Sequence, residues 1–294
     1  MGKQGDGERR APDSWRTVEM SELWAAITAG FEADDDAEAV GSDVSSSVRG
    51  GASGGAGDRT QGNVGDDASN EISSGGNGHV QGDGDSDAGD HTRQRRVVAV
   101  DGRSGSGKTT LADQLAALCG DHTFIVHTDD LAWYEPMFDW FHLLTDSILK
   151  PLQDGVSVSF TPPEWVRRGR TGSIDVPSDV ETLIIEGAGS SCKAVADFLD
   201  AAIWVRSDRV EAKRRGVERD VAANANGDRE ECVAFWDSWD EDERRFFAAD
   251  KPWERADFIV DGTSSTAFQP GMVTMKAGPA DADDSSASVS TNHV

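Results

Sequence analysis

The chain has 294 residues, of which 54 are Asp or Glu and 28 are Lys or Arg, so its formal net charge is −26 at pH 7. A chain this acidic repels polyanions, which argues against a nucleic-acid-binding protein and against a protein that binds anionic membranes. No apolar run approaches the roughly 18 residues of a membrane span, the N-terminus has no signal-peptide core, and the three cysteines show neither metal-ligand nor disulfide spacing. These features favour a cytoplasmic protein.

Composition divides the chain into four segments. Residues 34–94 and 263–294 consist largely of Gly, Asp, Ser and Ala with few large apolar side chains, so we predict that both are disordered. Segment 1–33 contains a stripe of apolar residues at helical spacing, which predicts a short amphipathic helix with Ser21 as its cap: Met20, Leu23, Trp24, Ile27 and Phe31. This helix either docks on the main domain, as we expect, or binds a partner. Residues 95–262 remain for one compact domain.

A strand, a glycine-rich loop and a helix are predicted at the start of this domain. The apolar run 97–100 indicates a buried parallel strand, and after the loop leucines recur at helical spacing from Leu111 onward. Between them, residues 102–109 match the phosphate-loop pattern G-x-x-x-x-G-K-[ST] at every fixed position. The predicted nucleotide-binding residues are Gly102, Arg103, Ser104, Gly105, Ser106, Gly107, Lys108, Thr109 and Thr110.

The chemistry of this loop points to ATP and Mg²⁺. Its glycines let successive backbone amides turn toward one centre, and the N-terminus of the following helix adds partial positive charge. Lys108 would reach the β- and γ-phosphates, and the Thr109 hydroxyl would complete the shell of a Mg²⁺ ion that keeps several waters.

Strands and helices alternate through the rest of the domain. This pattern predicts an α/β fold of the P-loop NTPase type. Its three layers are helices, a five-stranded parallel sheet and helices again (α/β/α), and a helical lid is added. The further strands are expected at 123–127, 182–187, 201–205 and 258–260, and the helices at 138–152 and within 208–249. Residues 153–180 are expected to be mostly loop, with a small hairpin.

Three carboxylates fall at the ends of predicted strands, on the side of the sheet where the phosphate loop lies. Asp129 would accept the proton of a substrate hydroxyl and could bind Mg²⁺ through water, and Asp130 is the second choice for this base. Glu186 ends a buried strand, where a carboxylate is costly unless it meets a cation, so we assign it to Mg²⁺. The alternatives are an Asp pair that caps the next turn and a Glu186 that serves as a helix-cap partner.

Cationic residues gather in one predicted helical region of this acidic chain: Arg206, Arg209, Lys213, Arg214, Arg215 and Arg219. As a lid they would neutralise the charge that develops during phosphoryl transfer, and we assign catalytic roles to Arg215 and Arg219, which share a face. The alternative is a solvated face paired with nearby carboxylates.

Aromatic residues lie in the segments expected to flank the acceptor: Trp133, Tyr134, Phe138, Trp140 and Trp165. One or two could stack on a planar base, and the others would belong to the core. Asp139 is a candidate to hold a pair of vicinal hydroxyls.

At these residues the sequence resembles the uridine kinase-like branch of the phosphate-loop kinases, over residues 95–262. Asp129-Asp130-Leu131 is similar to the family's Asp-Asp-Phe type motif, in which the first Asp is the base, with Leu in place of an aromatic residue. Phe138-Asp139 looks like the family's Phe-Asp, whose Asp binds the ribose hydroxyls, and Glu186-Gly187 looks like its third-strand Glu-Gly. The lid pattern of the family looks like Arg214, Arg215 and Arg219-Asp220.

The segment that would select the substrate departs from the family pattern. Uridine kinases carry Pro-x-Tyr-Asp and a nearby His, whereas this chain reads Pro162-Pro163-Glu164-Trp165, followed by Arg167, Arg168 and Arg170. Arginines at this place would also suit an acceptor that already carries an anionic group. The predicted substrate contacts are Asp129, Asp139, Trp165 and Arg170.

These observations predict an ATP- and Mg²⁺-dependent kinase of uridine kinase type that phosphorylates a hydroxyl of a nucleoside-like small molecule. A kinase for a phosphorylated sugar is one alternative, and an ATP-binding regulator or scaffold without kinase activity is another. A GTPase is least favoured because no Asn-Lys-x-Asp segment is present. The sequence leaves the oligomeric state open.

Overall fold

The computed structural model describes residues 15–29, 95–263 and 270–279. The predicted disordered segment 34–94 and most of the predicted tail lie outside the described residues. No helix of the described part is long and apolar enough to cross a bilayer.

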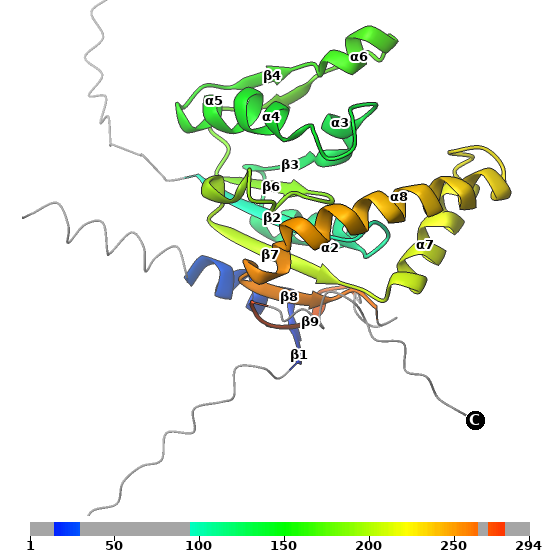
Figure 1. Ribbon diagram of the computed structural model, residues 1–294. Coiled ribbons are helices and arrows are strands. Elements are labelled where there is room, and N and C mark those ends of the chain that lie inside the picture. Colours follow the sequence, from blue (N-terminus) through cyan, green and yellow to red (C-terminus); the bar gives the residue numbers. More distant parts are fainter. Residues whose placement is uncertain (1–14, 30–94, 264–269, 280–294) are drawn as a thin grey trace, which may run out of the picture. The chain divides into compact units, whose positions relative to one another are not determined.

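A seven-stranded sheet forms the middle of the fold, with strand order β1-β9-β8-β7-β2-β6-β3 (Figure 1). The five strands predicted from the sequence are present, and all pair in parallel. They are β2 (Arg96–Gly102), β3 (Thr123–His127), β6 (Thr182–Glu186), β7 (Ala201–Arg206) and β8 (Phe258–Asp261). The predicted α/β class is confirmed.

Two antiparallel strands at one edge correct the predicted count of five. β9 (Met272–Ala277) pairs with β8, and β1 (Arg16–Glu19) pairs with β9. The prediction of disorder was therefore wrong for 272–277, and the N-terminal helix begins at Met20, so that Ser21 lies inside its first turn and is not its cap. The physical reason is long-range pairing, in which Val18 lies opposite Val273 and both are buried.

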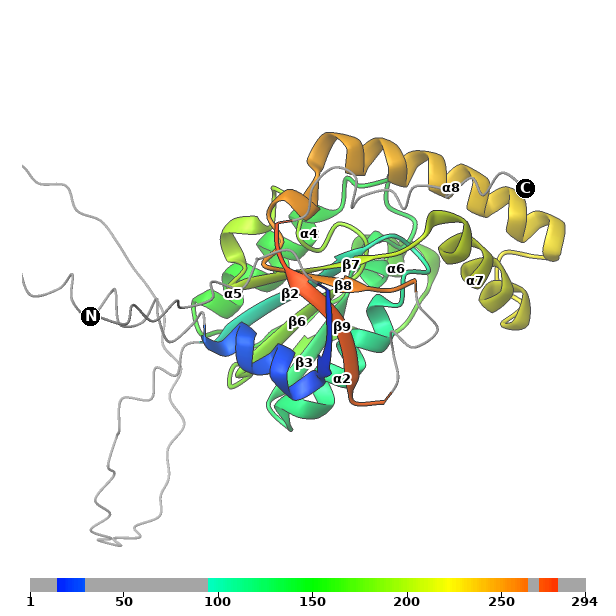
Figure 2. The ribbon, with the colours of Figure 1, turned by 90° about the horizontal axis from the view of Figure 1, so that it is seen from below.

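Helices cover both faces of the sheet, which gives three layers (Figures 1 and 2). One face packs against α2 (Lys108–Cys119) and against the helix over 20–29, through a core that includes Leu23, Ile27 and Leu111. The predicted apolar stripe of the N-terminal helix therefore lies in the core.

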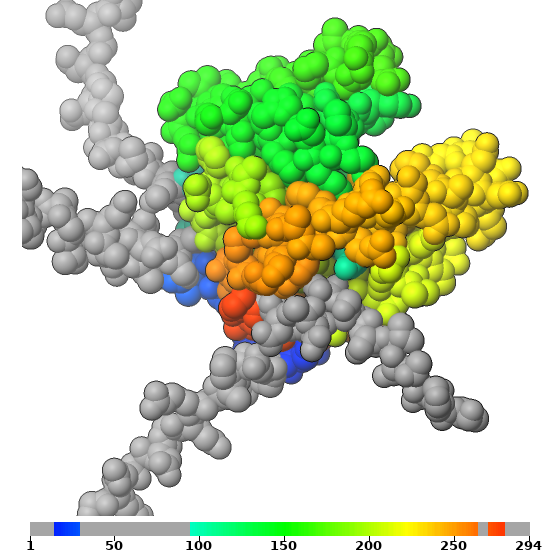
Figure 3. Space-filling model, viewed as in Figure 1, coloured from blue at the N-terminus to red at the C-terminus, as the bar shows by residue number. Residues whose placement is uncertain are grey.

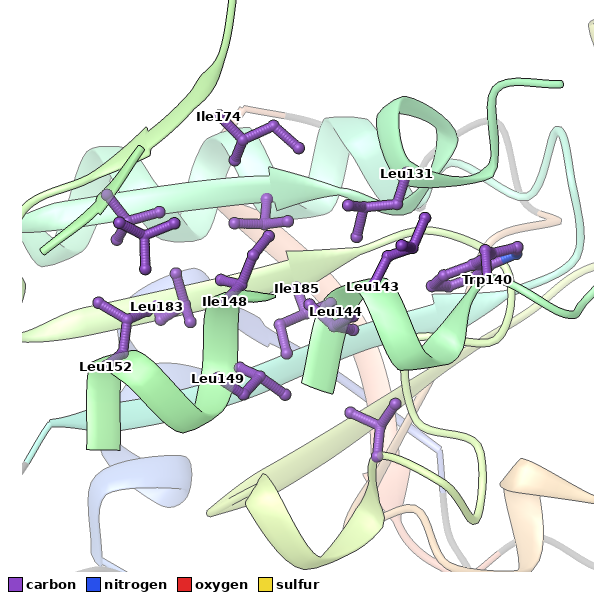
Figure 4. Close-up of a cluster of buried hydrophobic side chains, with 14 of the residues drawn as sticks. Leu131, Trp140, Leu143, Leu144, Ile148, Leu149, Leu152, Ile174, Leu183 and Ile185 are labelled. Carbon is purple, nitrogen blue, oxygen red and sulfur yellow. The ribbon is translucent and has the colours of Figure 1, made fainter. Parts of the chain in front are cut away.

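The opposite face packs against a helical stretch that is predicted as one helix over 138–152. It consists of α4 (Phe141–Leu144), a π-helical turn η2 (Thr145–Leu149) and α5 (Lys150–Gln153). The helix begins three residues later than predicted because Phe138 has a left-handed backbone, with φ of 53°. Leu183 and Ile185 of β6 point toward this stretch (Figure 4), whereas Ile184 belongs to the core of the other face.

The remaining elements form the rim of the site. After β3 comes the short α3 (Thr128–Ala132), and the expected hairpin is present as β4 and β5, with α6 inserted between them. The long charged region folds into two helices, α7 and α8, where one region was expected. The bounds are β4 (Val158–Phe160), α6 (Pro163–Arg168), β5 (Ile174–Val176), η3 (Ala196–Phe198), α7 (Arg209–Ala222), α8 (Arg229–Asp250) and η4 (Pro252–Glu254).

Candidate nucleotide and acceptor site

The glycine-rich loop joins β2 to α2 at the carboxyl edge of the parallel strands, as predicted. Gly105 adopts φ of +76°, and a Cβ there would lie 2.2 Å from the carbonyl oxygen of Ala212 in α7, so only glycine fits. Among the described residues the amides of Gly105 and Gly107 meet no hydrogen-bond acceptor. α2 begins at Lys108, so these amides lie next to the N-terminus of a helix, an arrangement that suits an anion.

Lys108 and Glu186 both bond to residues of the loop. Lys108 is buried, and its ammonium group donates to the carbonyl oxygen of Arg103 at 3.0 Å. Glu186 ends β6 and is 6% exposed; it accepts from the Thr109 hydroxyl at 3.1 Å. The helix that follows the loop and the strand that neighbours β2 therefore bring Thr109 and Glu186 together, as the sequence predicts.

His127 completes the environment of Glu186. β3 and β6 run in parallel register with His127 beside Glu186, and the His127 Nδ1 lies 2.7 Å from the second carboxylate oxygen. Burial acts to raise the pKa of Glu186, but the hydrogen bond with His127 and the charge of Lys108 outweigh it, so the pKa is lowered. The same hydrogen bond raises the pKa of His127. Glu186 is therefore an ionised acceptor next to the loop.

Asp129 lies on the same side, in the first turn of α3. It is open to solvent, yet protein atoms surround it closely enough that desolvation raises its pKa, while the charge of Lys108 lowers it and that of Glu186 raises it. Asp130 points elsewhere and pairs with Arg170 at 2.5 Å. Lys108, Glu186 and Asp129 thus lie within electrostatic reach of one another.

The residues assigned to Mg²⁺ suit that ion. Glu186 holds the Thr109 hydroxyl, and the raised pKa of Asp129 reflects a carboxylate whose charge would be favoured by a nearby cation. No group of three or more His, Cys, Asp or Glu in the described chain could hold a metal ion by itself. Magnesium in phosphoryl-transfer sites usually takes one or two carboxylates and completes its shell with phosphate and water.

The two arginines assigned to catalysis differ in their surroundings. Arg219 is exposed on α7, and its charge acts on the pKa of Asp129. Arg215 instead donates to the carbonyl oxygens of Gly262 and Thr263, at 2.6 and 2.7 Å. The other lid cations follow the solvated-face alternative, since Arg209, Lys213 and Arg214 are paired with carboxylates.

A cavity adjoins Asp129. Most of its lining is apolar or aromatic, and its residues are Thr128, Asp129, Ala132, Glu135, Pro136, Met137, Phe138, Trp140, Ala188 and Trp239. Tyr134 and Phe138, at φ of 61° and 53°, hold left-handed backbone conformations that bulky residues rarely adopt. Strain of this kind, of order 1–3 kcal/mol per residue, tends to persist where function requires it.

Three of the predicted substrate contacts do not line this cavity. Asp139 is exposed. Trp165 is buried in the core, donates its indole N–H to the carbonyl oxygen of Asp130 at 2.8 Å, and carries the guanidinium of Arg170 on its ring. Arg167 and Arg168 pair with Glu164 of the same helix.

Four residues of the site were missed at the sequence level. His127 could have been inferred, because it ends a predicted strand next to the one that ends at Glu186. Asp101 is fully buried and accepts hydrogen bonds from the loop after β6. Trp239 and Glu243 of α8 both bond to Ser104. No motif or spacing marks Trp239 or Glu243 as part of a phosphate-binding loop.

Comparison with known proteins finds similar solved structures. A possible uridine kinase from Bacillus stearothermophilus is 19% identical, covering 56% of this chain and 88% of that one, with a TM-score of 0.35. The YGR205w protein is 10% identical, covering 63% and 90%, with a TM-score of 0.39. TT1252 from Thermus thermophilus is 19% identical, covering 58% and 90%, with a TM-score of 0.29.

One of these structures is described as a possible uridine kinase, and the sequence resemblance named the same family. At such low identities the similarity concerns the fold and says nothing about what this chain acts on. No protein-family model matches the sequence, and no curated protein matches it.

Proposed function

We propose that this chain is an ATP- and Mg²⁺-dependent kinase of uridine kinase type, which transfers the γ-phosphoryl group to a hydroxyl of a nucleoside-like small molecule. The observation that carries the proposal is the convergence of Lys108, Glu186 and Asp129 at the mouth of the glycine-rich loop. A phosphate-binding loop, a metal-facing carboxylate and a proton acceptor are the parts that this reaction needs.

The proposed reaction gives each of these groups a task, and Asp129 has two. The amides of Gly105 and Gly107 and the ammonium of Lys108 would bind the phosphates, and Thr109, Glu186 and Asp129 would hold Mg²⁺, which would neutralise phosphate charge. The acceptor oxygen bonds to the γ-phosphorus as its proton passes to Asp129, and the bond from that phosphorus to the bridging oxygen breaks to release ADP. Arg219, whose charge acts on Asp129, would stabilise the charge that develops during transfer.

The cavity beside Asp129 supports a neutral acceptor with a planar part. Aromatic side chains line it, and no lysine or arginine does. The arginines of and after α6, which could have suited a phosphorylated sugar, are engaged by Glu164 and Asp130. An acceptor with an anionic group would therefore find no countercharge among the lining residues, and a nucleoside fits better.

Asp129 and Asp130 provide a matched pair for the test. The protein is incubated with ATP, Mg²⁺ and a panel of nucleosides and sugar phosphates, and ADP release is measured. We expect one neutral acceptor to stimulate turnover, Asp129→Asn to lower kcat about 10²- to 10⁴-fold, and Asp130→Asn to retain most of it. Because Asp129→Asn keeps the loop, it should still bind ADP. Equal activity of both variants, or no stimulation by any acceptor, would contradict the proposal.

A further inference from the structure

The long helix α8 is bonded directly to the phosphate loop at Ser104. The indole N–H of Trp239 donates to the Ser104 hydroxyl at 2.8 Å, and the Ser104 amide donates to the Glu243 carboxylate at 2.7 Å. Trp239 and Glu243 are four residues apart and share one face of α8. Glu243 is only 3% exposed, so this contact belongs to the interior of the protein. In Figure 3 the orange α8 runs across the face of the molecule, continuous with the yellow α7.

The same helix forms a wall of the cavity beside Asp129. The ring of Trp239 lines the cavity together with Phe138, at a centroid distance of 6.1 Å. About two helical turns further on, Phe246 stacks on Phe138 with parallel rings and centroids 4.0 Å apart. Because Phe138 holds a strained backbone, its packing against α8 helps to keep the cavity in shape.

Trp239 is therefore shared by two places that the proposed reaction must bring together. Its ring lines the acceptor cavity, and its indole N–H donates to the hydroxyl of Ser104 in the phosphate loop. The position of the ring determines where the N–H points, since the indole is rigid. A change in the cavity wall is thus transmitted to Ser104, which directly precedes Gly105, one of the two residues whose amides we assign to the anion.

We propose that Trp239 is a positioning residue that couples the acceptor cavity to the phosphate loop, so that an ordered cavity wall raises the affinity of the loop for nucleotide. The identification of the cavity as the acceptor site rests on the proposed function, but the coupling itself is a property of the contacts among Phe138, Trp239 and Ser104. This coupling makes Trp239 part of the nucleotide site, although its ring lies in the wall of the acceptor cavity.

A double-mutant cycle on the full chain tests the hydrogen bond. ADP affinity is measured by isothermal titration calorimetry, without acceptor, for Trp239→Phe, Ser104→Ala and the double variant. Phe keeps a ring in the cavity wall but has no donor. We expect each single variant to weaken ADP binding about 3- to 10-fold, and the double variant to be no weaker than either single one. Trp236→Phe is the matched control, because its indole N–H on the same helix goes to Asp220, and its ADP affinity should stay within about twofold of the unaltered chain.

The coupling to the cavity is tested by Phe138→Leu, which changes the cavity wall but touches no loop residue. We expect it to weaken ADP binding in the unaltered chain and to have no effect when Ser104 is already Ala. Additive effects of Trp239→Phe and Ser104→Ala, or an equal effect of Phe138→Leu in both backgrounds, would overturn the inference. Thermal unfolding checks that each variant is folded. If Trp239→Phe does not fold, the effect of Phe138→Leu on ADP affinity, with and without Ser104→Ala, still tests the coupling.

This experiment separates the inference from the proposed function. If no acceptor is ever phosphorylated but the ADP cycle behaves as expected, the coupling stands and kinase activity does not. If the unaltered chain binds no ADP, both are wrong.

Discussion

Replacing Asp101 by Asn tests how the phosphate loop is tied to the loop that follows β6. Asp101 is fully buried at the end of β2. One carboxylate oxygen accepts from the amides of Gly102 and Gly189, at 2.6 and 2.9 Å. The other accepts from the amide and the hydroxyl of Ser191, at 3.0 and 2.8 Å. All four partners donate, whereas Asn offers one acceptor oxygen and one NH₂ group.

The structure allows the cost to be worked out. With the amide nitrogen facing Ser191, the hydroxyl can rotate and accept from it, but the Ser191 amide is left without an acceptor. A buried unmatched donor costs about 1–3 kcal/mol. Burial raises the pKa of Asp101 even though the four hydrogen bonds lower it, so removal of the charge relieves part of this cost. We therefore expect a net loss of about 1–2 kcal/mol, or a melting temperature lower by about 2–8 °C.

The assay is thermal unfolding of the full chain, with Asp121→Asn as the control because Asp121 is exposed. We also expect Asp101→Asn to weaken ADP binding, since the loop after Glu186 loses the bond of its Ser191 amide to the residue that precedes the phosphate loop. An Asp101→Asn variant that is as stable as the unaltered chain and binds ADP equally well would refute the reasoning. Such a result would mean that the free-energy cost of burying the Asp101 carboxylate cancels the free energy gained from its hydrogen bonds.

Two further predictions concern the core and the pair beside the loop. Leu23 of the N-terminal helix is fully buried, so Leu23→Ala should lower the free energy of unfolding by about 2–5 kcal/mol. The control Glu22→Ala, on the exposed side of the helix, should be nearly neutral in the same melting experiment. Equal stabilities of the two variants would contradict docking of the helix. The hydrogen bond with Glu186 raises the pKa of His127; burial acts to raise the pKa of Glu186, but that bond and Lys108 lower it. The pair therefore makes its full contribution to the stability of the fold between about pH 4.3 and pH 6.5, the ordinary pKa values of Glu and His. This contribution is lost as the pH rises through the raised pKa of His127. The melting-temperature difference between the unaltered chain and His127→Asn should accordingly be larger at pH 5.5 than at pH 9, and a pH-independent difference would count against the pair.

The central strands could be predicted because each carries its own signal. Val97–Val100, Leu183–Ile185 and Ile203–Val205 are short runs of large apolar residues, as expected for strands covered on both faces. β1 and β9 lack such a signal, because each is a short stretch inside a polar segment. β1 becomes a strand by pairing with β9, which lies 253 to 259 residues further along the chain, and β9 pairs with both β1 and β8. Only the folded sheet supplies the partner.

Some residues of the candidate site could likewise be predicted from the sequence, and others could not. Lys108, Asp129 and Glu186 were found because the motif spacing and the ends of parallel strands place them at one edge. Trp239 and Glu243 could not be found, because which face of a helix meets the loop depends on how α8 crosses the sheet. The choice of Trp165 and Arg170 as substrate contacts followed the position of these residues in the sequence, while the structure gives them to Asp130.

Helical spacing explains why Arg219 differs from Arg214 and Arg215 of the same helix. Arg214 has Glu211 and Glu218 three and four residues away, Arg215 has Glu211, and each cation is held by them. Arg219 has Gly, Ala, Arg and Ala at the corresponding positions, so its own helix offers no carboxylate at that spacing. It contacts the adjacent Asp220, whose second oxygen also holds the Trp236 indole. The side chain thus stays on the exposed face, where its charge acts on Asp129, and for this reason Arg219, rather than Arg215, is the arginine we expect to serve the reaction.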